Sequence, residues 1–140
     1  ATGVTPAMEA KMVGQGSQYA VGIVDSKGNP LDGGKTYRLH VLPNAPAKDF
    51  WSAIVYDNQT RSMLQTDQDF PQVSSLDKGL VVNKDGSVDV YFGPKAPAGM
   101  EQNWIQTIPG KGCNMLFRLY GPLEPWFDKT WKLSEIELVK

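Results

Sequence analysis

The sequence predicts a mainly β protein, an antiparallel β-sandwich with one or two short helices. Short runs rich in Val, Ile, Tyr, Phe and Trp recur along its 140 residues. Glycines (14) and prolines (10) separate these runs, and both residue types mark turns. A chain of this length suits one domain, so we expect residues 1–140 to form a single sandwich.

The N-terminal segment, residues 1–17, is expected to be an extension that could hold a short helix over residues 6–16. Pro6 suits the first position of a helix, and Met8 and Met12 are four residues apart, on one helical face. The segment has neither a charged-then-apolar signal pattern nor an initiator Met. These features suggest a mature protein or a trimmed fragment.

Alternation of apolar and polar residues defines the strands of the first half. The predicted strands cover residues 18–24, 36–42 and 50–56. In the second of them, Tyr37 and Leu39 alternate with polar residues that include His40, so one face is apolar and the other polar. In the third, both faces are largely apolar, which predicts a central, buried strand.

The second half begins with a polar connection over residues 57–76 and continues with a hairpin. The hairpin joins residues 80–83 to residues 87–92, because the sequence around Gly86 is typical of a tight turn. Further strands are predicted at residues 103–108, 113–120 and 132–139, and a short helix at residues 124–129.

Charge and hydropathy exclude two classes of partner. The formal net charge is −1 and no basic run occurs, so the electrostatic footprint of a nucleic-acid-binding protein is absent. The longest apolar runs are a few residues long, too short to span a bilayer. We therefore expect no nucleic acid and no membrane span. A small ligand, a partner domain and a second copy of the chain stay open as partners.

Metal ligands and nucleophiles are scarce. The chain has one cysteine, Cys113, and one histidine, His40, which excludes an internal disulfide and a cysteine zinc site. We expect no metal, no cofactor and no assignable catalytic residue. Cys113 is interpreted as a small, inert, half-buried side chain. His40 is a candidate base, but no Ser or Asp is tied to it by local spacing.

Four acids are the remaining catalytic candidates, and they lie at strand ends or in loops. They are Asp57, Asp67, Asp69 and Glu101. Paired carboxylates can hydrolyse glycosidic bonds, and Asp67 and Asp69 are only two residues apart. Loop acids are more commonly solvated than catalytic, so solvated acids are the preferred interpretation.

Tryptophan is the other distinctive component, with four residues in or beside predicted strands. Trp51 is expected in the core. Trp104 and Trp126 lie close to polar or Pro-rich turns, and core packing and ligand contact are about equally compatible with that position. Aromatic side chains on a concave sheet face commonly bind sugars and other flat, amphipathic ligands.

Five segments of the sequence form a specific combination. They are Gly33–Leu39, Phe50–Asp57, Asn83–Val88, Asn103–Ile105 and Phe117–Pro122. In order and content they resemble the bacterial family named domain of unknown function 1214, over about residues 19–140. The resemblance implies a β-sandwich of jelly-roll type.

The resemblance implies no activity, because the family has no established catalytic residues. It implies a partner domain, since members often follow another uncharacterised domain, numbered 1254. It also favours the bacterial cell envelope or periplasm, since many members look exported. One departure lies after Asn103 and Trp104, where members tend to have a proline earlier than Pro109. If this loop rims a pocket, the pocket has a different shape in this chain.

The motif residues predict a ligand site. Arg118 alternates with apolar neighbours and Asp57 ends the central strand, so these two could form a buried ion pair that fixes the fold. In the functional interpretation, Arg118 contacts an anionic or polar ligand, Trp104 is a stacking wall and Asn103 donates a hydrogen bond. The predicted ligand-binding residues are therefore Trp104, Arg118, Asn103 and Asp57.

Three functions are compatible with these observations. We prefer a non-catalytic ligand-binding or assembly module, with an aromatic and polar cleft for a carbohydrate-like or other small polar ligand. The second is a purely structural interaction domain, which predicts a large, flat apolar patch. The third is a hydrolase of a sugar or ester that uses the loop carboxylates or His40.

Overall fold

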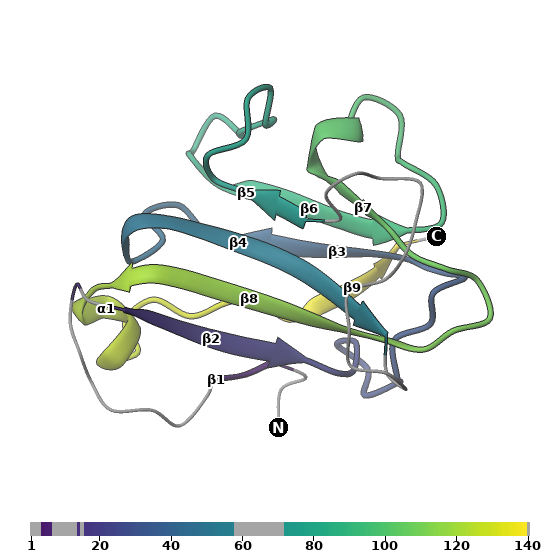
Figure 1. Cartoon of the computed structure of the whole chain (residues 1–140), viewed down its shortest axis with the longest axis horizontal. Coiled ribbons are helices and arrows are strands. Elements are labelled where there is room, and N and C mark those ends of the chain that lie inside the picture. Colours follow the sequence, from purple (N-terminus) through teal and green to yellow (C-terminus); the bar gives the residue numbers. More distant parts are fainter. Residues whose placement is uncertain (1–3, 7–13, 15, 58–71, 140) are drawn as a thin grey trace.

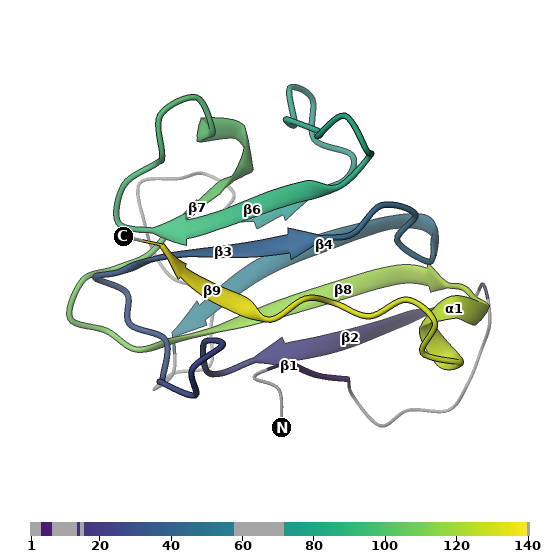
Figure 2. The ribbon, with the colours of Figure 1, turned by 180° about the vertical axis from the view of Figure 1, so that it is seen from behind.

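The chain folds into two β-sheets that pack face to face around a common core (Figures 1 and 2). The computed structural model describes residues 4–6, 14, 16–57 and 72–139. Across the first sheet the order is β1 (Val4–Pro6), β2 (Ser17–Gly22), β8 (Cys113–Pro122), β4 (Ala47–Asp57) and β5 (Gln72–Ser74). Across the second it is β7 (Trp104–Gln106), β6 (Val88–Gly93), β3 (Thr36–Val41) and β9 (Ile136–Val139). The predicted mainly β sandwich is confirmed.

Two short helices occur among the described residues, and one of them lies where the sequence predicts a helix, at residues 124–129. The 3₁₀-helix η1 (Glu101–Asn103) directly precedes β7, and α1 (Glu124–Phe127) directly follows β8. In α1 the proline Pro125 stands in the first turn, where a missing backbone N–H costs nothing. Within the described part of the chain, no helix is long and apolar enough to cross a membrane.

Alternation along each strand divides its residues between the core and the outer face. In β3, Tyr37, Leu39 and Val41 are almost fully buried, while the residues between them face outward. In β4, Ala53 and Val55 are fully buried toward the core, and the outward Ile54 is also nearly covered. As expected, β4 is an interior strand, because β8 and β5 flank it.

The core lies between the inner faces of the two sheets and is rich in aromatic rings. The ring of Phe117 on β8 lies 5.5 Å from that of Trp51 and 6.1 Å from that of Trp131, centre to centre. Tyr37 and Phe92 stack at 5.4 Å. Because Trp51, Trp131 and Trp126 are each less than a tenth exposed, these three tryptophans belong to the packing of the fold.

One strand pairing departs from the predicted antiparallel pattern. β7 runs parallel to β6, with Trp104 opposite Tyr91 and Ile105 opposite Phe92. A parallel pair needs a crossover rather than a tight turn, and the chain between Gly93 and Trp104, which contains η1, provides it.

The hairpin predicted at residues 80–92 forms only in part. The turn is present, since Asn83 N–H donates to Ser87 O at 2.8 Å and Gly86 N–H to Asn83 O at 2.9 Å. Residues 80–83 are nevertheless not a strand. Val81 has both backbone groups bonded to the Asn103 side chain, so they are not available to a neighbouring strand.

The helix predicted over residues 6–16 is wrong at its first residue. Pro6 ends β1, where it is paired antiparallel with Ala20 of β2. Proline suits this place because β1 is an edge strand. Residues 7–13 and 15, including Met8 and Met12, lie outside the described residues.

Candidate functional site

The candidate site lies on the outer face of the five-stranded sheet, centred on Arg118 in the middle of β8. Phe117 and Leu119 on either side of it point into the core and are fully buried, so alternation turns Arg118 outward. The register places Tyr19 of β2 opposite Arg118 on one side and Ser52 of β4 opposite it on the other. Arg118 is therefore flanked by a strand on each side.

Among the described residues, aromatic rings rather than acids lie around the guanidinium group. Arg118 Cζ lies 5.8 Å from the ring centre of Tyr19 and 5.9 Å from that of Tyr120. Tyr120 in turn stacks on Phe50 with a centroid distance of 4.2 Å. Cation–π contact of this kind holds an arginine in place without neutralising its charge.

No acid of the described chain pairs with Arg118. Among the described residues, the contacts between basic and acidic side chains are those of Arg38 with Glu137 and of His40 with Asp89, both on the other sheet. Arg118 Nε is buried and has no hydrogen-bond partner, and the same is true of the Ser52 hydroxyl opposite it. A buried polar atom without a partner costs about 1–3 kcal/mol, so the fold keeps Arg118 at this position at an energetic disadvantage.

A groove runs along the same face beside Arg118 and has a volume of about 340 Å³. It is lined by Tyr19, Val21, Tyr56, Asn114, Leu116 and Arg118. The register orders these residues along β8: Tyr19 opposite Arg118, Val21 opposite Leu116, and Tyr56 opposite Asn114. One end of the groove is therefore cationic, the middle is apolar, and the other end is neutral and polar.

Asp57, predicted as a partner of Arg118, lies elsewhere along the ladder. It is opposite Cys113, five positions from Arg118, which is about 16 Å at the usual rise of a strand. Ser52 occupies the position opposite Arg118 instead. The structure describes the backbone of Asp57 but not its side chain.

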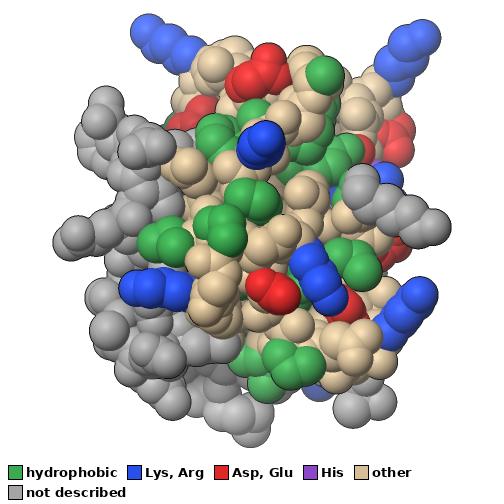
Figure 3. All heavy atoms as spheres, turned by 90° about the vertical axis from the view of Figure 1, so that its right-hand side faces the viewer, with side chains coloured by type: hydrophobic (Ala, Val, Ile, Leu, Met, Phe, Trp, Pro, Cys, Tyr) green, Lys and Arg blue, Asp and Glu red, His purple; other side chains and the backbone are tan. Residues whose placement is uncertain are grey.

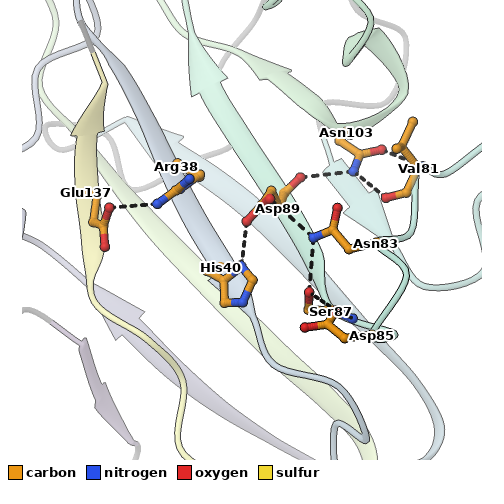
Figure 4. A network of polar contacts seen from close by, with 9 residues as sticks. All are labelled: Arg38, His40, Val81, Asn83, Asp85, Ser87, Asp89, Asn103 and Glu137. Carbon is orange, nitrogen blue, oxygen red and sulfur yellow. Dashed lines mark hydrogen bonds and ion pairs between the residues drawn. The ribbon is translucent and has the colours of Figure 1, made fainter.

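Asn103, predicted to donate to a ligand, is fully buried at the end of η1. Its Oδ1 accepts the Val81 N–H at 2.9 Å, and its Nδ2 donates to Val81 O and to Asp89 O, both at 2.9 Å. The amide thus fastens the loop before β6 to the sheet (Figure 4). Both N–H donors of the amide are therefore used within the fold.

Trp104, predicted as a stacking wall, belongs to the other sheet. It is half-buried on β7 beside Tyr91, and its indole Nε1 donates to Gly93 O at 3.0 Å. The structure therefore separates the predicted site residues: Arg118 faces outward on one sheet, whereas Asn103 and Trp104 lie at the edge of the other.

A second group of polar side chains crosses the outer face of the four-stranded sheet (Figure 4). His40 Nδ1 lies 2.6 Å from Asp89 Oδ1, and the other oxygen of Asp89 accepts from Asn83 Nδ2 at 3.3 Å. Arg38 Nη2 donates to Glu137 at 2.8 Å. The hydroxyl of Ser87 donates to Asp85. Within the described residues, no hydroxyl or thiol is hydrogen-bonded to His40, so the pair lacks the nucleophile of a triad.

The other catalytic candidates form no catalytic or metal site among the described residues. Asp67 and Asp69 lie outside the described residues, and Glu101 is exposed in η1. Cys113 is 1% exposed and faces the core, where a thiol is inert. No group of three or more His, Cys, Asp or Glu residues able to hold a metal ion occurs among the described residues.

Two turn aspartates have shifted pKa values with a structural cause. The backbone N–H of Asn29 lowers the pKa of Asp25, with a smaller contribution from Lys27 N–H. The Ser87 hydroxyl and then its N–H lower the pKa of Asp85. Both carboxylates cap turns, which is the common role of aspartate at such positions.

One end of the molecule carries charges of both signs among the described residues (Figure 3). At the end of the sandwich shown in Figure 3, blue and red side chains are interspersed among the described residues, without a broad area of either sign. This distribution agrees with the formal net charge of −1.

Comparison with known proteins places the chain in a family. The family model named Protein of unknown function (DUF1214) matches residues 16–124, which include the groove residues of β2, β4 and β8. The chain belongs to the DUF1214 family. No curated protein matches it.

Two solved structures resemble this DUF1214 chain. The VPA0106 protein from Vibrio parahaemolyticus is 26% identical, with a TM-score of 0.74 over 89% of this chain and 31% of that one. An uncharacterized protein from Burkholderia cenocepacia is 20% identical, with a TM-score of 0.55 over 98% of this chain and 34% of that one. The latter shows the fold alone. The DUF1214 chain spans about a third of the length of either protein.

The groove residues other than Arg118 were not singled out from the sequence, although one signal was available. Alternation within the predicted strand at residues 113–120 places Asn114, Leu116 and Arg118 on one face. Tyr19 and Tyr56 come from strands far away in the sequence, so their position beside β8 depends on the sheet order.

Proposed function

We propose that this DUF1214 domain is a non-catalytic module that binds a small polar ligand, including carbohydrate-like ligands, in the groove beside Arg118. The observation that carries the proposal is the state of Arg118: a half-buried cation between tyrosine rings, with no acid among the described residues to pair with it. A half-buried cation without an acidic partner in the protein is well suited to bind a polar or anionic group of a ligand.

The dimensions and lining of the groove also support this proposal. Its volume of about 340 Å³ falls at the lower end of the range for small-molecule sites. Tyr19 and Tyr56 offer ring faces and hydroxyls, and Asn114 offers both a donor and an acceptor. Rings combined with a few polar groups are typical of sites for sugars and other amphipathic molecules.

Assembly is the second candidate function. The chain covers about a third of two structurally similar proteins, so the outer face of the sheet could instead contact another segment of a longer chain. In that case the groove residues would be protected by a protein surface and would not respond to small molecules.

A ligand screen by NMR tests the proposal directly. Neutral sugars, sugar acids and small aryl acids and amides would be added to the ¹⁵N-labelled protein, and backbone shifts followed. Binding that shifts residues of β2 and β8 around Arg118, and that weakens in Arg118→Gln, is the expected result. Binding elsewhere, or none across the panel, would contradict the proposal and favour assembly.

A further inference from the structure

We infer that the ligand of this groove is an amphipathic carboxylate, bound with its acid group at Arg118 and its apolar body over Leu116 and Val21. A hydrogen-bonding group on the ligand would meet Asn114 and Tyr56 at the other end. This inference rests on the proposed binding function and narrows its ligand class.

Charge complementarity defines the first end. Among the described residues that line the groove, Arg118 is the one with a charged side chain, and it has no acidic partner among the described residues. A guanidinium group is planar and matches a carboxylate with two parallel hydrogen bonds. The tyrosine rings at 5.8 and 5.9 Å limit its orientation, so less side-chain entropy is lost when an acid binds.

The middle of the groove favours an apolar body. Leu116 of β8 lies opposite Val21 of β2 on one side and Ile54 of β4 on the other. These three aliphatic side chains form one row across the sheet; Val21 and Leu116 line the groove, whereas Ile54 is nearly covered. A sugar ring covered with hydroxyls would lose hydrogen bonds to water against such a row, whereas an aryl or alkyl group would not.

The described residues at the far end are polar and uncharged. Asn114 and Tyr56 are opposite each other on β8 and β4, and both line the groove. Neither side chain makes a hydrogen bond to another described residue. Arg118 and Asn114 are four residues apart on β8, about 13 Å, so a ligand of roughly that length could contact both ends.

A matched pair of compounds tests the inference. 6-(4-Hydroxyphenyl)hexanoate, which is about as long as the distance between the two ends of the groove, and its primary amide have the same shape and differ in charge. We expect the acid to shift β2 and β8 resonances around Arg118 and Leu116 and to bind at least about tenfold more tightly than the amide. Arg118→Gln should remove this preference by weakening the acid to the level of the amide.

Two control variants distinguish the effect of the Arg118 charge from the effect of the protein's net charge and from loss of folding. Arg38→Gln makes the same change on the other sheet, where Arg38 is paired with Glu137, and should leave the preference for the acid unchanged. If Arg118→Gln fails to fold, Arg118→Lys keeps the charge but loses the planar fork. It should bind the acid more weakly than wild type, yet still more tightly than the amide.

The possible outcomes distinguish the two proposals. Equal binding of acid and amide at the groove would overturn the carboxylate inference and leave the binding function standing, as would preferential binding of neutral sugars there. Loss of the preference in Arg38→Gln as well as in Arg118→Gln would also overturn it. No binding of either compound or of any neutral sugar at the groove would overturn both proposals.

Discussion

His40 of β3 and Asp89 of β6 are directly opposite each other, and the imidazole Nδ1 lies 2.6 Å from a carboxylate oxygen. The second carboxylate oxygen accepts from Asn83 in the turn before β6. The His40 side chain is 35% exposed and that of Asp89 17%. This pair therefore connects two strands and a turn in a partly screened environment.

A double-mutant cycle on His40→Ala and Asp89→Ala measures this connection. We expect Asp89→Ala to lower the free energy of unfolding more than His40→Ala does, because it removes two contacts rather than one. The coupling energy should be about 0.5–1 kcal/mol. The matched cycle on Arg38 and Glu137, whose side chains are 38% and 55% exposed, should give less. A larger coupling in the more exposed pair would contradict this ranking.

Asn103 is the polar side chain whose loss should cost the most stability. Asn103→Ala removes three hydrogen bonds and leaves both backbone groups of Val81 without their partners. We expect a destabilisation of about 2–4 kcal/mol in urea unfolding. The neighbouring Gln102→Ala, at an exposed position of η1, should change stability by less than about 0.5 kcal/mol. Similar effects at both positions would show that the Asn103 bonds contribute little.

Gly33 and Gly34 should respond differently to the same substitution. A Cβ atom at Gly33 would collide with the backbone oxygens of Ile108 and Lys111, and Gly33 is itself hydrogen-bonded to Lys111 and Thr107. We expect Gly33→Ala to lower the unfolding free energy by about 2–4 kcal/mol. In Gly34→Ala the new atom meets nothing closer than 3.4 Å, so thermal denaturation should show a small change.

Asp25 should make folding sensitive to acid. Its folded-state pKa is lowered from 3.8, chiefly by the backbone N–H of Asn29. A carboxyl group whose pKa is lowered on folding stabilises the fold at pH values above its unfolded-state pKa. This contribution disappears as the pH falls through the folded-state pKa. Unfolding measured between about pH 2 and pH 6 should therefore show a smaller acid-induced loss in Asp25→Asn than in wild type. Parallel pH profiles for the two proteins would contradict this assignment.

The strands can be predicted from the sequence where one face of the strand packs against the core. In β3 the order Thr36 to Val41 alternates polar and apolar residues, and the structure buries every second one. The parallel direction of β7 could not be predicted in this way. A three-residue strand has the same pattern in either direction, and the direction depends on the crossover through η1.

The candidate site could be predicted only in part, for a similar reason. Arg118 was singled out by its place among apolar neighbours, and the structure shows it on the outer face. The role of Asn103 depends on Val81, 22 residues earlier in the chain, and no local pattern connects the two. Likewise, Tyr19 reaches Arg118 because β2 pairs with β8, and this pairing spans most of the sequence.

The central position of β8 has a consequence for synthesis of the chain on the ribosome. β8 lies between β2 and β4 and pairs with both, although both are translated long before it. Each of them therefore emerges with an unpaired edge facing the gap that β8 will fill. Since long-range pairings form slowly and open edges favour aggregation, the nascent protein is most vulnerable in the interval between translation of β4 and release of β8.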